Sequence, residues 1–127
     1  MYISAFLYPE RPLFQILPQA AQRRYHLLMS PAIVREAGRV MRERLGWEED
    51  VRIRHLKTLT KAGEIITPQI TLAVIPEDPP DNRVLECAVE GRANLIVSGD
   101  RHLRRLKMYQ GIPIVRPIDF LRALGIA

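Results

Sequence analysis

The sequence lacks most features of secreted, membrane-spanning and disulfide-bonded proteins. Its 127 residues include a single cysteine, Cys87, which excludes an internal disulfide and fits the reducing cytoplasm. The longest apolar stretch, over 65–75, is interrupted by polar residues and is far shorter than the roughly 20 residues of a transmembrane helix. The first residues show no cationic leader and no small-residue cleavage site. We therefore expect a cytoplasmic protein that is not associated with a membrane.

The common catalytic and nucleotide-binding motifs are also missing. There is no G-x-G-x-x-G, no P-loop, no H-E-x-x-H and no Cys/His cluster with zinc spacing. Ser98-Gly99 is not a nucleophile elbow, because that turn needs glycines two residues before and two residues after the serine. Aromatic residues make up only 6% of the chain, and no stacking platform for bases is evident. Acidic residues in unusual places are the remaining candidates for chemistry.

Charge and length give the first positive indications. Nineteen Lys and Arg against fourteen Asp and Glu leave a net charge of +5. An excess of this sign suggests a polyanionic partner, with nucleic acid first. A chain of this length forms one domain with a real core and is too short for two.

Hydrophobic patterning predicts helices that alternate with short apolar strands. Helix start and stop signals predict helices over 11–22, 30–46, 47–63, 78–91, 100–111 and 118–125. Short apolar runs predict strands over 25–30, 69–76, 94–99 and 112–117. Strands separated by helices favour βαβ units, which build a parallel sheet between two layers of helices.

Asp81 and Asp100 lie at positions where a purely solvated acid is not expected. Asp81 is at the amino end of the apolar stripe of the helix over 78–91, and a carboxylate that faces the core is costly unless it is paired or binds a metal. Asp100 follows the strand over 94–99, at the edge where open α/β sheets bind ligands. Each also has a simpler role, since Asp81 can complete a capping box and Asp100 can cap the next helix.

Glu36 completes a set of three acids from three elements. It lies at the edge of the apolar arc of the helix over 30–46, where a salt bridge to Arg39 or Arg42 is the simpler role. If the three carboxylates meet at one end of a parallel sheet, they repel each other unless a hard cation neutralises them. Oxygen ligands suit Mg²⁺ or Mn²⁺, and such an ion on a basic protein indicates phosphoryl chemistry on a polyanion.

Two segments strongly resemble the C-terminal half of PIN-domain nucleases, in the branch of toxins related to VapC-like ribonucleases. They are "DPPDNRVLECAVEGRANLIVSGDRHLRRL" and "GIPIVRPIDFL", and "SPAIVREAGRVM" is similar to an earlier segment of the same family. The similarity covers nearly the whole chain. It implies a single PIN-like domain over 1–127 with a three-layer α/β/α fold and a parallel sheet of four or five strands.

The resemblance also implies a site, a reaction and partners. Glu36, Asp81 and Asp100 match three of the four family acids that bind Mg²⁺ or Mn²⁺ and serve catalysis, and Asn82 and Ser98 match supporting positions. The implied reaction is endonucleolytic cleavage of RNA by metal-activated water. Many relatives are toxins that dimerise and are neutralised by a small antitoxin protein. A basic cluster beside Asp100 is a candidate groove for the RNA backbone; it consists of Arg101, Arg104, Arg105 and Lys107.

The chain departs from the family at its beginning. PIN domains open with a strand that ends in an Asp-Thr-Asn-like signature, whereas "YISAFL" resembles the start of the first helix, just beyond that signature. We therefore expect a truncated domain without the first strand and its Asp. The explanations are a start codon assigned too late, a degenerate copy, or a sheet closed by rearrangement or by a partner's strand. The alternative function is accordingly an inactive PIN domain that binds RNA or an antitoxin without cleavage.

Overall fold

The computed structural model describes residues 2–5 and 25–125 of the chain. The elements of this part are, in chain order, β1 (Tyr2–Ala5), β2 (His26–Met29), α2 (Pro31–Glu43), α3 (Glu49–Ala62), β3 (Gly63–Ile65), α4 (Pro79–Glu90), β4 (Leu95–Val97), α5 (Arg101–Leu106), β5 (Met108–Tyr109), β6 (Ile112–Val115) and α6 (Pro117–Ala123). The helix predicted over 11–22 lies outside the described residues.

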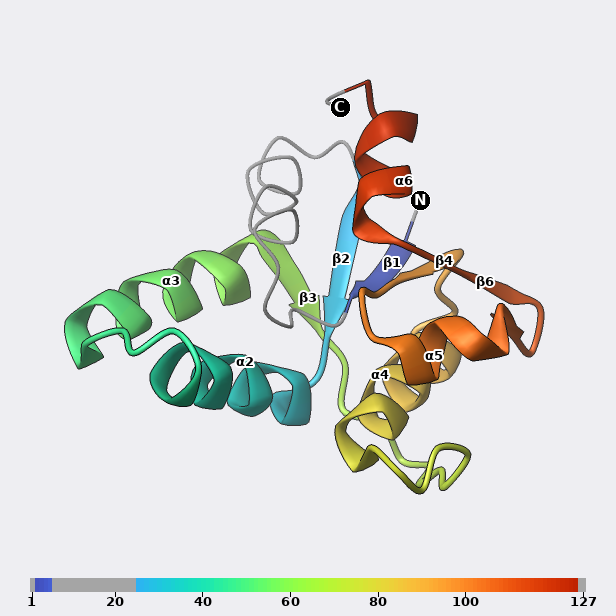
Figure 1. Ribbon diagram of the computed structural model, residues 1–127, viewed down its shortest axis with the longest axis horizontal. Coiled ribbons are helices and arrows are strands. Elements are labelled where there is room, and N and C mark those ends of the chain that lie inside the picture. Colours follow the sequence, from blue (N-terminus) through green and yellow to red (C-terminus); the bar gives the residue numbers. More distant parts are fainter. Residues whose placement is uncertain (1, 6–24, 126–127) are drawn as a thin grey trace.

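A mostly parallel sheet forms the middle of the molecule, with helices on both of its faces (Figure 1). The strand order is β3-β2-β1-β4-β6-β5, and only the short β5 is antiparallel to its neighbour. The two faces follow from the alternation of side chains along each strand. Leu27 and Met29 of β2 face one core with α2, α3 and α6, while Leu28 faces the other core with α4 and α5. The predicted three-layer α/β/α architecture is therefore confirmed.

The prediction that the first strand is missing is wrong. Tyr2–Ala5 forms β1 at the centre of the sheet, parallel to β2 on one side and to β4 on the other. Ile3 and Ser4 are both fully buried, and the Ser4 hydroxyl donates to the Val84 carbonyl of α4 at 3.3 Å. Four residues are enough for this strand because both neighbours pair with it, so their backbone groups are satisfied. The first strand is present, and Tyr2–Ala5 is not the start of a helix.

The acid expected at the end of the first strand is nevertheless absent. No carboxylate occurs in the chain before Glu10, so β1 carries none. The carboxyl end of β1 is Ala5, followed in the sequence by Phe6 and Leu7. None of these side chains can bind a cation.

The best-predicted helices begin where their capping signals lie. In α2, the Ser30 hydroxyl accepts from the Ile33 N–H at 3.2 Å and Pro31 occupies the first turn. In α4, Asp78 is the N-cap residue, and Gly91 follows the last turn as expected. None of the helices in the described ranges is long and apolar enough to cross a membrane.

Two predicted elements differ in the structure. The strand predicted over 69–76 does not form, because side chains of α4 take up the backbone N–H groups of that segment: Glu86 accepts from Leu72 at 2.7 Å, and Asn82 accepts from Ile75 at 2.9 Å. Instead, β3 follows α3 directly. The helix predicted over 100–111 ends at Leu106, because Lys107 has a φ of 60° and the next residues pair with β6.

Gly63 allows β3 to approach β2 closely. A Cβ there would lie 2.9 Å from the Leu27 carbonyl oxygen and 2.3 Å from Cε of Met29. We expect Gly63→Ala to lower the free energy of unfolding by about 1–3 kcal/mol, since the strand backbone must shift to relieve the overlap. The matched control is Gly38→Ala inside α2, where the nearest atom lies at 3.4 Å and the exchange should add about 0.5–1 kcal/mol. Urea denaturation measures both, and equal effects would contradict the close approach.

Candidate metal centre

The first turns of α4 and α5 meet at the carboxyl edge of the sheet. Asp78 precedes α4 and Asp81 lies in its first turn, while Asp100 precedes α5 and His102 lies in its first turn. Each of these four residues offers one ligand atom, and the four atoms all lie within 4.8 Å of one another. Three carboxylates and an imidazole therefore share one small volume.

Asp81 is the most constrained member of this cluster. It is fully buried, and neither carboxylate oxygen accepts a hydrogen bond from any described residue. Its polar neighbour is Asp100, another acceptor, with which it can only share a proton. The capping-box alternative fails, because no N–H of the helix start reaches the Asp81 carboxylate and the Asp78 side chain makes no capping hydrogen bond. A buried carboxylate without donors is expensive and calls for a cation or a proton.

In the absence of a cation, that carboxylate holds a proton. Burial raises the pKa of Asp81 to about 9, and the shared hydrogen bond with Asp100 and the charges of Asp100, Asp78 and Glu36 add to the shift. Burial also raises the pKa of Asp78, and the negative charge of Asp100 raises it further. Burial alone would raise the pKa of Asp100 too, but hydrogen bonds from Asp81 and the His102 N–H outweigh it, and that pKa is lowered.

Asp100 caps a helix and also lies in the acidic cluster. Its Oδ1 accepts from the His102 N–H at 2.7 Å and so caps α5. At the same time its carboxylate belongs to the acidic cluster. The Asp100 N–H donates to the buried hydroxyl of Ser98 at 2.9 Å, which fixes the bend between β4 and α5. Ser98 therefore supports Asp100 through its backbone.

Asn82 contacts the backbone of the neighbouring segment and does not hydrogen-bond to any described acid of the site. Its side chain accepts from the Ile75 N–H at 2.9 Å and donates to the Ile75 carbonyl at 2.8 Å. This pair fastens the segment that leads into Asp78 to α4. Asn82 thus holds one side of the cluster in place.

Glu36 faces the same region without joining the four ligand atoms. It lines a cavity of about 210 Å³ together with Pro79 and Pro80 at the start of α4, and its charge contributes to the raised pKa of Asp81. Its carboxylate forms the ion pair with Arg39 that the sequence offered as the simpler role. A part for Glu36 in metal binding or catalysis stays a prediction.

Asp78 and His102 belong to the cluster although the sequence did not predict them as site residues. Nδ1 of His102 lies 3.5 Å from Asp78 Oδ2 and 3.4 Å from Asp100 Oδ1, longer than a good hydrogen bond, and it has no other described partner. Asp78 was detectable, because residues three apart at a helix start share one face, so Asp78 and Asp81 lie side by side. His102 follows Asp100 by two residues, but the sequence favoured a solvated position on the helix over a contact with phosphate or a metal-bound water, because it does not show that Asp78 comes within reach.

The residues present fit a divalent cation. Three of the buried side-chain atoms without a hydrogen-bond partner in the described part belong to this cluster, namely both oxygens of Asp81 and Nδ1 of His102. One cation would satisfy all of them and relieve the repulsion between the carboxylates. The predicted basic cluster lies next to it: Arg101, Arg104 and Arg105 are on α5, and Lys107 follows its last residue.

Comparison with known proteins agrees with this geometry. A family model described as PIN domain matches residues 1–102, which include β1 and all four residues of the cluster. No curated protein and no solved structure gave a significant match. PIN domains are generally metal-dependent nucleases, and an acidic cluster where two helices start at a parallel sheet edge is consistent with that activity. The chain belongs to the PIN-domain family.

Proposed function

We propose that this protein is a Mg²⁺- or Mn²⁺-dependent endoribonuclease, and that it is the toxin of a toxin–antitoxin pair. The observation that carries the proposal is the fully buried carboxylate of Asp81, which no described donor reaches, inside a cluster of three acids. A divalent cation bound there supplies charge neutralisation and activation of water for attack on a phosphodiester.

The residues of the site have distinct roles in this proposal. Asp81 and Asp100 hold the cation, and Glu36 lies across the neighbouring cavity, where it can orient a water molecule. Ser98 and Asn82 fix the two loops that carry the ligands. Asp78 and His102 offer the ligand atoms that the missing acid of β1 would otherwise supply.

The mixed ligand set bears on which ion is used. An imidazole nitrogen among carboxylates suits Mn²⁺ better than Mg²⁺, which prefers oxygen ligands and bound water. We therefore expect Mn²⁺ to support activity better than Mg²⁺ at equal concentration.

The nuclease activity is tested with the purified protein, a fluorescent RNA and either ion. We expect cleavage that stops with EDTA and falls by about a hundredfold or more in Asp100→Asn, because a ligand is lost. Asparagine caps helices as well as aspartate does, so α5 should persist. Asp50→Asn in the first turn of α3 is the matched control and should keep full activity. Cleavage that survives both EDTA and Asp100→Asn would come from a contaminant and would refute the proposal.

A specific observation favours a second function. Because β1 carries no acid, this PIN domain could bind RNA or an antitoxin without cutting. Calorimetry with Mn²⁺ separates the two functions: the inactive form binds no ion above a non-specific baseline, whereas the enzyme binds one that Asp81→Asn removes.

The family resemblance supports the remaining parts of the proposal. These are RNA as the substrate, a small antitoxin protein as the partner, a homodimer and a cytoplasmic location. Cys87 is the single cysteine of the chain and is a buried free thiol, and a chain that forms no internal disulfide fits a reducing compartment. Co-expression with the neighbouring gene product, followed by sizing of the complex, tests the partner.

A further inference from the structure

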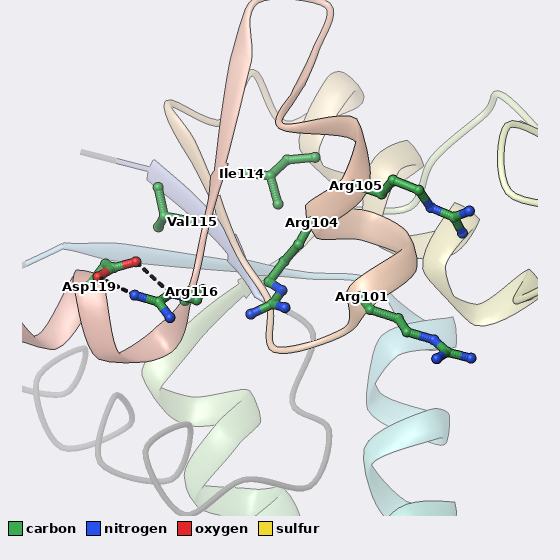
Figure 2. Close-up of a pocket in the computed structure, with 7 residues that line it drawn as sticks. All are labelled: Arg101, Arg104, Arg105, Ile114, Val115, Arg116 and Asp119. Atoms are coloured by element: carbon green, nitrogen blue, oxygen red, sulfur yellow. Dashed lines mark hydrogen bonds and ion pairs between the residues drawn. The ribbon is translucent and has the colours of Figure 1, made fainter.

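A groove of about 500 Å³ lies between α5 and the corner where β6 leads into α6 (Figure 2). Arg104 extends from α5 into this groove toward Arg116, while Arg101 and Arg105 extend on the other side of the helix. Ile114 and Val115 of β6 form the apolar part of its wall. The guanidinium groups therefore give this groove its character, and its apolar wall is small because Ile114 is buried.

The positive charge of this groove is only partly compensated. Asp119 is its one acid among the described residues, and it is already paired with Arg116 at 2.9 Å and lies 3.9 Å from Arg122. Arg101 and Arg104 form no ion pair with any described residue. Several exposed guanidinium groups around one carboxylate repel each other and attract an anion. Guanidinium groups match phosphate oxygens with paired hydrogen bonds, which a single ammonium group cannot do.

The groove is connected to the metal centre across α5. A second hollow is lined by Glu77, Arg101, His102 and Arg105, so it shares two arginines with the groove and one histidine with the acidic cluster. Glu77 pairs only loosely with Arg105, at 3.9 Å. Positive charge therefore continues from the metal centre over α5 to Arg116.

We propose that this path binds the phosphates of a single-stranded polynucleotide on one side of the scissile bond, with Arg104 and Arg116 holding a phosphate away from the metal. This inference rests on the proposed nuclease function and adds to it a direction for the substrate. None of the described residues that line the groove is aromatic, so it gives no stacking preference. The site thus accepts strands by their backbone and requires more than a dinucleotide.

The test is binding of a fluorescent oligonucleotide in EDTA, measured by anisotropy at several salt concentrations. We expect the double variant Arg104→Ala/Arg116→Ala to bind a dodecanucleotide about tenfold or more weakly than the wild type. The slope of log K against log salt should fall by about 1.4, or about 0.7 for each lost phosphate contact. A dinucleotide should bind the wild type and the double variant equally.

The matched control is Arg54→Ala/Lys57→Ala, which removes the same charge from exposed positions on α3, far from α5 (Figure 1). Equal weakening in both double variants, or none in the groove variant, would overturn the proposal. So would polyglutamate that competes as well as the oligonucleotide, since the groove would then fit an acidic peptide. Because EDTA removes cleavage from the measurement, failure of the nuclease function appears separately, as intact binding without cleavage when Mn²⁺ is added.

Discussion

Replacing Asp81 by asparagine is expected to stabilise the metal-free protein at pH 7 by about 2–4 kcal/mol. The folded-state pKa of Asp81 is about 9, well above the ordinary value of 3.8. Between these two pH values the folded protein binds one more proton than the unfolded chain, so wild-type stability falls as the pH rises through this window. The asparagine amide has nearly the same shape, does not titrate and can donate to Asp100. The variant therefore does not lose stability as the pH rises through this window.

The same variant should lose its response to metal. Millimolar Mn²⁺ should raise the urea midpoint of the wild type, because the ion binds the folded state alone, and should leave Asp81→Asn unchanged. Denaturation with EDTA or Mn²⁺ at pH 5, 7 and 8 measures both effects. Asp50→Asn, an exposed acid on α3, should stay within about 0.5 kcal/mol of the wild type. A metal-free Asp81→Asn protein less stable than the wild type would show that the carboxylate has a structural role.

The Asp81 carboxylate lowers the stability of the metal-free protein but is available to bind a metal, and this explains why it lacks hydrogen-bond donors. A carboxylate placed only for stability would have donors, as Glu86 has from Leu72 and Arg83. Asp81 has none among the described residues, although it is even more deeply buried. Proteins tolerate such local costs mainly where function needs them. The comparison between these two acids of one helix indicates that the Asp81 site is built for a ligand that is not part of the chain.

The parts of the fold that depend on local signals could be predicted from the sequence. Ser30 and Pro31 fix the start of α2, and Asp78 and Pro79 fix the start of α4. The central strand could not be found in this way, because four residues such as Tyr2–Ala5 suit a helix or a strand equally well. Their conformation is decided by pairing with β2 and β4, which come 20 or more residues later in the chain.

The residues of the site also differ in whether local sequence signals reveal them. Asp81 and Asp100 could be predicted as site residues because each lies at the end of an element, where the sequence shows both the boundary and the unusual acid. The meeting of Asp78 with His102 depends on how α4 and α5 pack on the same face of the sheet. That packing is set by core residues far from the site, such as Leu85 and Leu103, whose pattern shows that they are buried but not which helices they bring together.

The affinity for Mn²⁺ should depend steeply on pH. Because Asp81 has a pKa of about 9 without metal, an ion that binds at pH 7 must displace its proton. The apparent dissociation constant should therefore fall about tenfold for each unit by which the pH rises toward 9, or about a hundredfold from pH 6 to pH 8. An Asp81 that was already ionised at pH 6 would give no such dependence through its own proton.

Calorimetry in two buffers with different heats of ionisation counts the protons released. We expect about one proton for each ion bound at pH 7. His102→Gln separates this proton from one lost by the imidazole: the variant should bind Mn²⁺ more weakly but keep the same pH slope and the same proton count. If the slope vanishes in His102→Gln, the titrating group is the histidine, and the proton assigned to Asp81 is excluded. If the slope persists, the buried carboxylate itself links proton loss to metal binding, and the group whose burial destabilises the metal-free protein becomes a ligand of the cation once its proton is lost.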